Sequence, residues 1–268
     1  MKKYLVSLLI AGVLVLALTP AVNAKGNTEK AASVLTVGAS SVPHAELLNL
    51  IKGDLAAKGI TLKVVEFTDY VQPNSALIAG ELDANFFQHL PYLESNDEWQ
   101  AKLVSAFGVH VEPFGLYSKK YTSIDDIPNG ASIAIPNDPS NGGRALLLLQ
   151  SKGIIELSSS NLNVTIMDIT SNPKNLKFNE LEAAQLPRTL EDVDAATING
   201  NYALEAGFNP LKDSLIIEGA DSPYVNIVVV QKGKESDPKI LALKAALLSP
   251  KVKEYINSHY DGGVAAVF

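Results

Sequence analysis

The chain is organised around residues 81–95, which read Glu81-Leu82-Asp83-Ala84-Asn85-Phe86-Phe87-Gln88-His89-Leu90-Pro91-Tyr92-Leu93-Glu94-Ser95. This stretch begins with the pattern of a buried strand and breaks at Pro91. In open α/β sheets, ligands bind where the carboxyl ends of strands run into a loop or helix. Phe87, His89 and Tyr92 would lie at such an end as an aromatic cluster, two of whose members carry polar atoms. We interpret the cluster as one wall of a small-molecule pocket; the alternative is a strand end that packs into the core.

Strand and helix patterns alternate through the first half of the chain. The predicted elements are strands at residues 33–40, 61–67 and 81–87, and helices at residues 43–58 and 73–79. This β-α-β-α-β order is typical of a parallel sheet covered by helices. A polar helix around Trp99 and a strand-like alternation at residues 103–117 follow.

A second alternating set follows the break at Pro113-Phe114-Gly115. Its predicted elements are strands at residues 131–135, 163–169, 194–198 and 224–230, and helices at residues 145–150, 181–191, from Asn199 onward, and 238–259 in two pieces. The last strand and the last helices lack partners if this set is already complete. We therefore expect the chain to return to the first lobe, giving two lobes, two crossovers and an intervening cleft, where ligand sites are common. The predicted lobes are residues 34–116 plus 226–268, and residues 117–225.

Residues 1–24 have the pattern of a signal peptide. Two lysines precede the apolar run 4–18, and small residues lead to a cleavage site after Ala24. A membrane-spanning helix needs roughly 20 apolar residues, so we expect cleavage, a flexible leader at residues 25–33, and export to the periplasm or another extracytoplasmic space. The sequence contains no cysteine. We therefore expect a soluble protein that is not lipid-anchored through cysteine.

The composition argues against several partners and chemistries. The chain has 22 basic and 29 acidic residues, and loss of the two lysines of the signal would take its net charge from −7 to −9. Such an acidic surface argues against nucleic acid and anionic membranes as partners. The lack of cysteine excludes disulfides, thiolate zinc sites and a cysteine nucleophile. We expect the protein to be a monomer.

The strongest polar candidate reads Ser140-Asn141-Gly142-Gly143-Arg144. We expect its two glycines to expose backbone N–H groups at a helix start, where the helix dipole favours an anion. Arg144 is one of only two arginines, with Arg188, and its planar fork can pair bidentately with a carboxylate. Phosphate is the competing anion, but the P-loop spacing is absent. A simple capping turn is the alternative interpretation.

Three asparagines are further candidates for ligand binding. Asn199 and Asn201 lie at a predicted strand-to-helix junction, where asparagine is also an ordinary helix cap. Asn226 lies inside an apolar strand, where asparagine is disfavoured. A buried amide needs hydrogen-bond partners, and a bound ligand could be one of them.

The sequence contains little that indicates catalysis. The four histidines, which are His44, His89, His110 and His259, show no metal-ligand spacing, and no Gly-x-Ser-x-Gly motif occurs. We expect no catalytic residue, no metal site and no cofactor. His89 is interpreted as a hydrogen-bonding ring of the pocket.

Five segments resemble, in the same order, the NlpA-type methionine-binding proteins, which are the extracytoplasmic receptors of methionine ABC importers. The segments are Val34-Leu35-Thr36-Val37-Gly38-Ala39, Asp83-Ala84-Asn85-Phe86-Phe87-Gln88-His89-Leu90-Pro91-Tyr92-Leu93, Ile135-Pro136-Asn137-Asp138-Pro139-Ser140-Asn141-Gly142-Gly143-Arg144-Ala145-Leu146, Asn199-Gly200-Asn201-Tyr202-Ala203 and Tyr224-Val225-Asn226. The resemblance implies an α/β, two-lobed periplasmic-binding-protein type II fold, each lobe a mixed, mainly parallel sheet flanked by helices, with the ligand in the inter-lobe cleft. Family members usually carry a lipobox cysteine, which this chain lacks.

The resemblance also implies roles for the pocket residues. The residues around a thioether side chain would be Tyr70, Phe87, His89 and Tyr92. The residues at the polar end would be Arg144, which pairs with the carboxylate, and Asn141, Asn199 and Asn226.

The leading hypothesis is therefore a receptor that captures methionine, with L-methionine first, and delivers it to an inner-membrane ABC permease. Within this class, the alternatives are D-methionine, a methionyl dipeptide or another hydrophobic amino acid. From other classes, an exported hydrolase of amino-acid derivatives and a surface adhesin are the remote alternatives. Product formation from a supplied ester would identify the hydrolase, and the absence of a small-ligand thermal shift would identify the adhesin.

Overall fold

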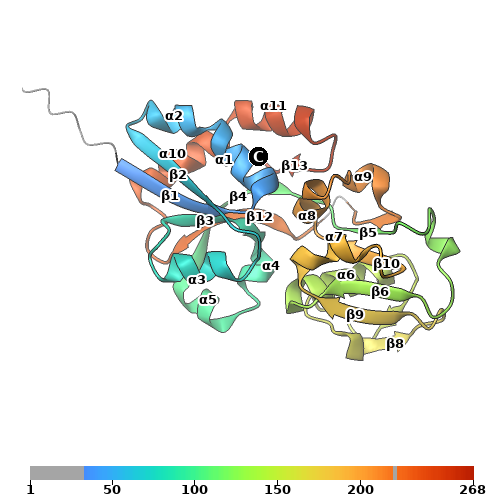
Figure 1. The fold of residues 1–268 in the computed structure, drawn as a ribbon. Coiled ribbons are helices and arrows are strands. Elements are labelled where there is room, and N and C mark those ends of the chain that lie inside the picture. Colours follow the sequence, from blue (N-terminus) through green and yellow to red (C-terminus); the bar gives the residue numbers. More distant parts are fainter. Residues whose placement is uncertain (1–32, 220–221) are drawn as a thin grey trace, which may run out of the picture. The chain divides into compact units, whose positions relative to one another are not determined.

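The computed structural model describes residues 33–219 and 222–268 (Figure 1). The predicted signal peptide, and all of the predicted leader except Ser33, lie outside these residues. Ser33 is the first residue of a strand. Within the described part of the chain, no helix is both long and apolar enough to cross a membrane.

The first lobe is built on a six-stranded mixed sheet with the order β13-β4-β12-β3-β1-β2. Its strands are β1 (Ser33–Ala39), β2 (Ile60–Glu66), β3 (Ala84–His89), β4 (Leu103–Val111), β12 (Val225–Gln231) and β13 (Ala265–Ala266). Strand β1 pairs in parallel with β2 and β3, whereas β12 runs antiparallel to β3 and β4. The sheet therefore joins segments from both ends of the described chain.

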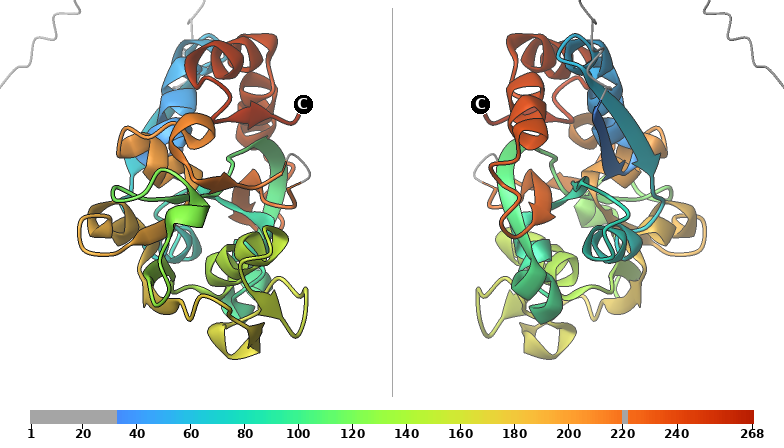
Figure 2. Two further views of the ribbon diagram at one scale, coloured as in Figure 1. Left: turned by 90° about the vertical axis from the view of Figure 1, so that its right-hand side faces the viewer. Right: turned by 90° about the vertical axis from the view of Figure 1, so that its left-hand side faces the viewer.

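The helices of the first lobe come from both ends of the chain as well. They are η1 (Ser41–Ala45), α1 (Glu46–Leu50), α2 (Lys52–Ala56), α3 (Gln72–Ile78), α4 (Leu90–Leu93), α5 (Asp97–Lys102), α10 (Pro238–Leu247) and α11 (Pro250–His259). Figure 2 shows the last two helices beside the first ones. Leu35, Val37, Leu47 and Leu243 meet in the core between them at 0% exposure, and each such buried side chain contributes about 1.5–3 kcal/mol.

The second lobe is built on a five-stranded sheet with the order β11-β5-β10-β6-β9. Its strands are β5 (Gly115–Tyr117), β6 (Ser132–Pro136), β9 (Lys177–Leu181), β10 (Ala195–Ile198) and β11 (Ile216–Ile217), with a separate hairpin of β7 (Glu156–Leu157) and β8 (Ile169–Ser171). Its helices and helical turns are η2 (Ile124–Asp126), α6 (Pro139–Ser151), η3 (Ile166–Asp168), η4 (Ala183–Gln185), α7 (Leu186–Thr189), α8 (Gly200–Glu205) and α9 (Pro210–Asp213). Strand β6 is parallel to both of its neighbours, β9 and β10.

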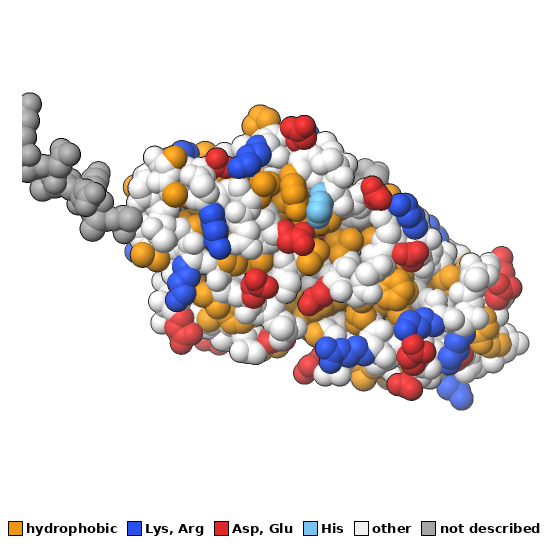
Figure 3. All heavy atoms as spheres, turned by 45° about the horizontal axis from the view of Figure 1, so that its top comes forward, with side chains coloured by type: hydrophobic (Ala, Val, Ile, Leu, Met, Phe, Trp, Pro, Cys, Tyr) orange, Lys and Arg blue, Asp and Glu red, His pale blue; other side chains and the backbone are white. Residues whose placement is uncertain are grey.

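The chain passes from one sheet to the other twice, between β4 and β5 and between β11 and β12. The two-lobed mixed α/β architecture is as predicted. The domain boundaries given above remain a prediction, since sheet membership alone does not define a domain. On the face drawn in Figure 3, acidic and basic side chains are interspersed.

Most predicted strands are confirmed, but the strand expected at residues 163–169 is wrong. Thr165 donates from its backbone N–H to the Asp168 carboxylate at 2.8 Å and from its hydroxyl at 3.0 Å. These bonds close the helical turn η3 in place of an extended strand. The strand of this region is β9, which is at the edge of the sheet and mostly exposed, so it has no clear apolar pattern.

Two predicted helices differ in extent. The helix expected from Ala145 begins six residues earlier at Pro139, because Asp138 caps it by accepting from the backbone N–H of Asn141 at 2.8 Å. The helix expected at residues 181–191 is instead the pair of short elements η4 and α7. Pro187 lies in the first turn of α7, where its missing N–H is tolerated.

Candidate ligand-binding site

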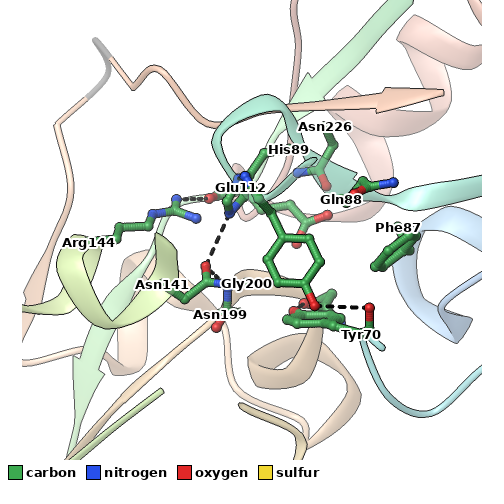
Figure 4. Close-up of a pocket in the computed structure, with 12 residues that line it drawn as sticks. Tyr70, Phe87, Gln88, His89, Glu112, Asn141, Arg144, Asn199, Gly200 and Asn226 are labelled. Atoms are coloured by element: carbon green, nitrogen blue, oxygen red, sulfur yellow. Dashed lines mark hydrogen bonds between the residues drawn. The ribbon is translucent and has the colours of Figure 1, made fainter. Parts of the chain in front are cut away.

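A pocket between the two lobes brings together all eight side chains predicted for the site (Figure 4). The space between its lining residues, which includes open solvent, is about 320 Å³. The residues contributed by the first lobe and its crossover are Tyr70, Phe87, Gln88, His89, Tyr92, Glu112 and Asn226. The remaining lining residues come from α6, from α8 and from the residue that precedes α8; they are Asn141, Arg144, Asn199, Gly200 and Asn201.

Three aromatic rings form one wall. The ring centroids of Tyr70, Phe87 and Tyr92 are 5.7–6.0 Å apart in each pairing, which is the spacing of favourable aromatic contacts. The Tyr92 hydroxyl donates to the backbone carbonyl of Tyr70 at 3.0 Å, and the Tyr70 hydroxyl donates to Asn201 Oδ1 at 2.5 Å. Burial raises the pKa of both phenols well above its usual value. The wall is thus neutral, and one of its rings bonds across the cleft to α8.

His89 joins this wall to the opposite lobe. Its Nδ1 accepts from the backbone N–H of Tyr92 at 3.2 Å, which caps α4. The ring proton therefore lies on Nε2, which donates to Asn141 Oδ1 at 3.1 Å. Burial, and secondarily the charge of Arg144, lowers the His89 pKa to about 3, so the ring is neutral and its tautomer is determined by its partners.

Asn141 is the centre of a directional hydrogen-bond network. Its Nδ2 donates to both carboxylate oxygens of Asp138 at 3.0 Å. Its Oδ1 accepts from His89 and from Asn199 Nδ2, the latter at 2.8 Å. Because Asn199 donates in this direction, its Oδ1 is left as a buried acceptor with no partner among the described residues. The reverse holds for Asn201, whose Oδ1 is used by Tyr70 and whose Nδ2 is a buried donor with no described partner.

Arg144 is held by a carboxylate of the chain itself. Its Nε and Nη2 donate to the two oxygens of Glu218 at 2.6 and 2.5 Å, and Nη2 also donates to the backbone carbonyl of Glu112 at 3.1 Å. The guanidinium carbon also lies over two aromatic rings, 4.8 Å from the centroid of Phe114 and 4.1 Å from that of Tyr224. No hydrogen bond within the described chain uses Nη1. The fork that was predicted to pair with a ligand carboxylate is bound bidentately by Glu218 in this structure, so its pairing with a ligand stays a prediction.

The predicted role of the two glycines is wrong. Gly142 donates its backbone N–H to the carbonyl of Asp138 inside α6, so it does not offer this group to an anion. A Cβ on Gly142 would lie 2.9 Å from the carbonyl oxygen of Pro136, and one on Gly143 would collide with the carbonyl oxygen of Leu162. The glycines instead allow α6 to pack closely against neighbouring backbone.

Two polar residues inside the first sheet also reach the pocket. Asn226 on β12 is buried, and its Oδ1 accepts from His44 Nε2 at 3.1 Å; no hydrogen bond among the described residues uses its Nδ2. Gln88 is buried as well, but its amide bonds Asn74 and Asn85 beneath the pocket. We infer that Asn226 can contact a ligand, whereas Gln88 supports β3.

Sequence reasoning missed Glu112, the one acidic side chain among the residues that line the pocket. It is 5% exposed and follows β4 directly. A Cβ on Gly200 would lie 2.6 Å from the Glu112 Cβ, so only glycine allows α8 to approach this residue. The signal in the sequence was the polar pair His110 and Glu112 at the end of a mostly apolar strand, which is close to the signal that identified Asn226.

Two lobes on separate sheets, with an aromatic and polar pocket lined from both, define a solute-binding protein of the two-lobed type II class. A family model described as NlpA lipoprotein matches residues 35–268, and the chain belongs to this family. It is 41% identical over 254 residues to the methionine-binding lipoprotein MetQ of Bacillus subtilis, covering 92% of this chain and 93% of the relative.

Solved structures agree with this assignment. A nutrient-binding protein from Burkholderia cenocepacia bound to methionine has a TM-score of 0.84 and 47% identity, covering 87% of this chain and 100% of that chain. An ABC transporter, periplasmic substrate-binding protein from Coxiella burnetii has a TM-score of 0.82 and 45% identity, covering 87% and 99%.

The comparisons correct one expectation. The matching family and the B. subtilis relative are both described as lipoproteins. This contradicts the expectation that the protein is free of a lipid anchor, and we withdraw it.

Proposed function

We propose that this protein is the extracytoplasmic substrate-binding component of an ABC importer and that it captures methionine, with L-methionine as the preferred ligand. The observation that carries the proposal is the division of one pocket into an aromatic wall and a polar end. The polar end contains hydrogen-bonding atoms of both senses with no partner in the described chain: an acceptor on Asn199 and a donor on Asn201. A zwitterion offers both complements.

The thioether would lie against the aromatic wall. Tyr70, Phe87 and Tyr92 are neutral rings about 6 Å apart, and sulfur gains from contact with aromatic rings by roughly 0.3–1.5 kcal/mol. A ligand side chain with further polar groups would bury those groups against the aromatic wall without hydrogen-bond partners. The wall therefore favours a flexible apolar side chain that contains sulfur.

The charged groups of the ligand would meet the polar end. Arg144 Nη1, Asn201 Nδ2 and Asn226 Nδ2 are donors suited to the ligand carboxylate. Glu112 and Asn199 Oδ1 are acceptors suited to its ammonium group. Asn141 acts indirectly, because both ends of its amide are engaged by His89, Asn199 and Asp138, and we propose that it orients Asn199.

The lining of the pocket supports a single amino acid, because it offers one aromatic wall and one polar end. A methionyl dipeptide would have a second side chain and a peptide group to place. D-methionine has the same volume as L-methionine and is the second candidate.

We also propose that the protein is exported, acts as a monomer, docks on a membrane permease and is not an enzyme. The donor and acceptor pattern of the pocket supports the last point. The ring nitrogens of His89 are both engaged in hydrogen bonds, so this histidine is not placed as a free general base for a hydrolytic reaction.

Native mass spectrometry followed by calorimetry tests the proposal. Freshly purified protein should carry a mass equal to methionine, and the protein freed of it should bind L-methionine more tightly than D-methionine, leucine or methionylmethionine. Binding should raise the free energy of unfolding by about 2.7 kcal/mol at a hundredfold excess over Kd. If none of the four compounds binds, the receptor function is refuted; if an ester is hydrolysed, the protein is an enzyme.

A further inference from the structure

Two fully buried histidines lie directly behind Glu112. His44 is in η1 and His110 is on β4, with exposures of 1% and 0%. His110 Nε2 lies 2.8 Å from Glu112 Oε1, and His44 Nε2 lies 3.4 Å from the same oxygen. Two imidazoles from separate elements thus converge on one carboxylate oxygen.

The partners of the two rings determine where their protons lie. His44 Nε2 bonds Asn226 Oδ1, which can only accept, so the proton is on Nε2 and Nδ1 accepts from the Ser40 hydroxyl at 2.7 Å. His110 Nε2 faces the carboxylate and donates to it. Burial is the largest cause that lowers the pKa, to about 4 for His44 and about 3 for His110. Each ring is therefore neutral, with its single proton directed at Glu112 or its neighbour Asn226.

The cluster of His44, His110 and Glu112 has to be distinguished from a metal site. Ligand atoms of His44, His110 and Glu112 lie within 4.8 Å of one another, a spacing that would suit a cation. A metal ligand must present a lone pair, however, and the Nε2 atoms that face Glu112 carry protons. The hydrogen-bond pattern thus favours a carboxyl group held by the N–H of His110, with the N–H of His44 donated to Asn226 beside it.

The charges around the pocket indicate the role of the Glu112 carboxyl group. Arg144 is the cation nearest to it in the lining, but its fork is paired with Glu218. Burial raises the Glu112 pKa, and His44, Arg144 and the backbone N–H of Asn201 oppose that rise. Glu112 is therefore a buried carboxyl group that lines the pocket and has no cation of its own as an ion-pair partner among the described residues. An ammonium group placed beside it would favour its charged form.

We propose that His44 and His110 are positioning residues that hold the Glu112 carboxylate toward the pocket, so that the site requires an ammonium group on its ligand. The inference rests on the proposed function and deepens it, since it assigns the recognition of the amino group to a layer of side chains behind the lining. Gly200 completes the arrangement by leaving room for Glu112 beside α8.

The test compares two ligands that differ only in the amino group. These are L-methionine and 4-(methylthio)butanoic acid, and the measured quantity is the ratio of their affinities by calorimetry. His110→Leu should lower this ratio about 10- to 100-fold, as expected for a lost hydrogen bond to a charged group. His110→Gln, whose amide nitrogen can reach the position of Nε2, should restore most of it. His259→Gln on exposed α11 is the matched control and should leave the ratio unchanged.

A second variant keeps the test valid if His110→Leu does not fold. Ser40→Ala removes only the hydroxyl that orients His44, and it should lower the ratio in the same direction by a smaller factor. Equal losses of affinity for both ligands would show a purely structural role and overturn the inference. Stoichiometric zinc in the purified protein, lost in His110→Leu, would overturn it as well.

The outcome also separates the inference from the function on which it rests. Wild-type protein that binds L-methionine, with a ratio insensitive to His110 and Ser40, refutes the inference alone. Wild-type protein that binds neither ligand refutes both.

Discussion

The pocket wall built on β3 and its flanking loops is held together differently from the wall built on α6 and α8. In the first, Tyr70, Phe87 and Tyr92 pack ring against ring. In the second, Asn141 and Arg144 bond their neighbours in fixed directions. Packing tolerates substitutions that keep the volume, whereas removal of one member of a buried network leaves its partners unpaired. We therefore expect substitutions in the polar wall to lower the free energy of unfolding more than substitutions in the aromatic wall do.

The largest effect is expected at Arg144. Arg144→Ala leaves Glu218 as a mostly buried carboxylate without its cation, and should lower the free energy of unfolding by roughly 3–5 kcal/mol. Urea denaturation measures the loss. Arg144→Lys should recover part of it, because an ammonium cannot reproduce the bidentate fork. Arg188→Ala, at the exposed second arginine, is the control and should be nearly neutral.

A double variant distinguishes the pair from the scaffold. Adding Glu218→Ala to Arg144→Ala should cost less than the sum of the two single changes, since it removes the unpaired anion. Additive losses would show that the two residues act independently, and the contrast between the walls would then lose its main support.

Acid should weaken the first wall before the second. The folded-state pKa values of His44, His89 and His110 are about 4, 3 and 3 because of burial. The unfolded chain therefore binds more protons below pH 6.5, and stability falls as the pH drops, by at most about 1.4 kcal/mol per ring and pH unit. Glu112 has the opposite effect on stability. Its pKa is raised in the folded state, so on acidification the folded protein takes up this proton before the unfolded chain does.

Hydrogen exchange between pH 6.5 and 5 checks this expectation. Amides of β3 and β4 should lose protection earlier than those of β6 and β10, since the three buried histidines lie on or against the first sheet. A simultaneous loss in both sheets would show that the histidines do not weaken one lobe selectively. His259→Gln is the control: because that side chain is exposed, the variant should lose protection at acidic pH as the wild-type protein does.

A moderate effect is expected at Asn141. Asn141→Ala removes the acceptor shared by His89 and Asn199 and the donor to Asp138, and should lower the free energy of unfolding by about 1–3 kcal/mol. It should also weaken L-methionine binding, because Asn199 would no longer be oriented. Asn163→Ala, an asparagine outside the pocket, is a matched control. An unchanged affinity for L-methionine would contradict the proposal that Asn141 orients Asn199.

The smallest effect is expected at Tyr92. Tyr92→Phe keeps the ring and removes only the hydroxyl that donates to the carbonyl of Tyr70. The free energy of unfolding should fall by about 0.5–1.5 kcal/mol, with little change in methionine affinity. Calorimetry and thermal melting measure both. A large loss of affinity would mean that this hydroxyl contacts the ligand, and the aromatic wall would then be a polar wall too.

Local patterns in the sequence were sufficient to place the pocket. The strand into Pro91 predicted the aromatic cluster, and Asn226 was identified because an amide inside an apolar strand needs a partner. Both inferences depend on side-chain periodicity and on the location of ligand sites at strand ends. Such local patterns singled out seven of the eight candidates, whereas Tyr70 was assigned to the site only by the resemblance to the NlpA-type proteins. The structure brings all eight into one pocket.

Tertiary structure alone decided which partner each of these groups has. Glu218 lies 74 positions from Arg144, and Leu162 packs on Gly143 from a separate loop; no local pattern encodes such pairings. Glu112 was missed for the same reason, since its place behind α8 depends on Gly200. A sequence specifies which side chains share a face of a strand or helix, whereas the hydrogen-bond directions of a buried cluster depend on which faces are packed together.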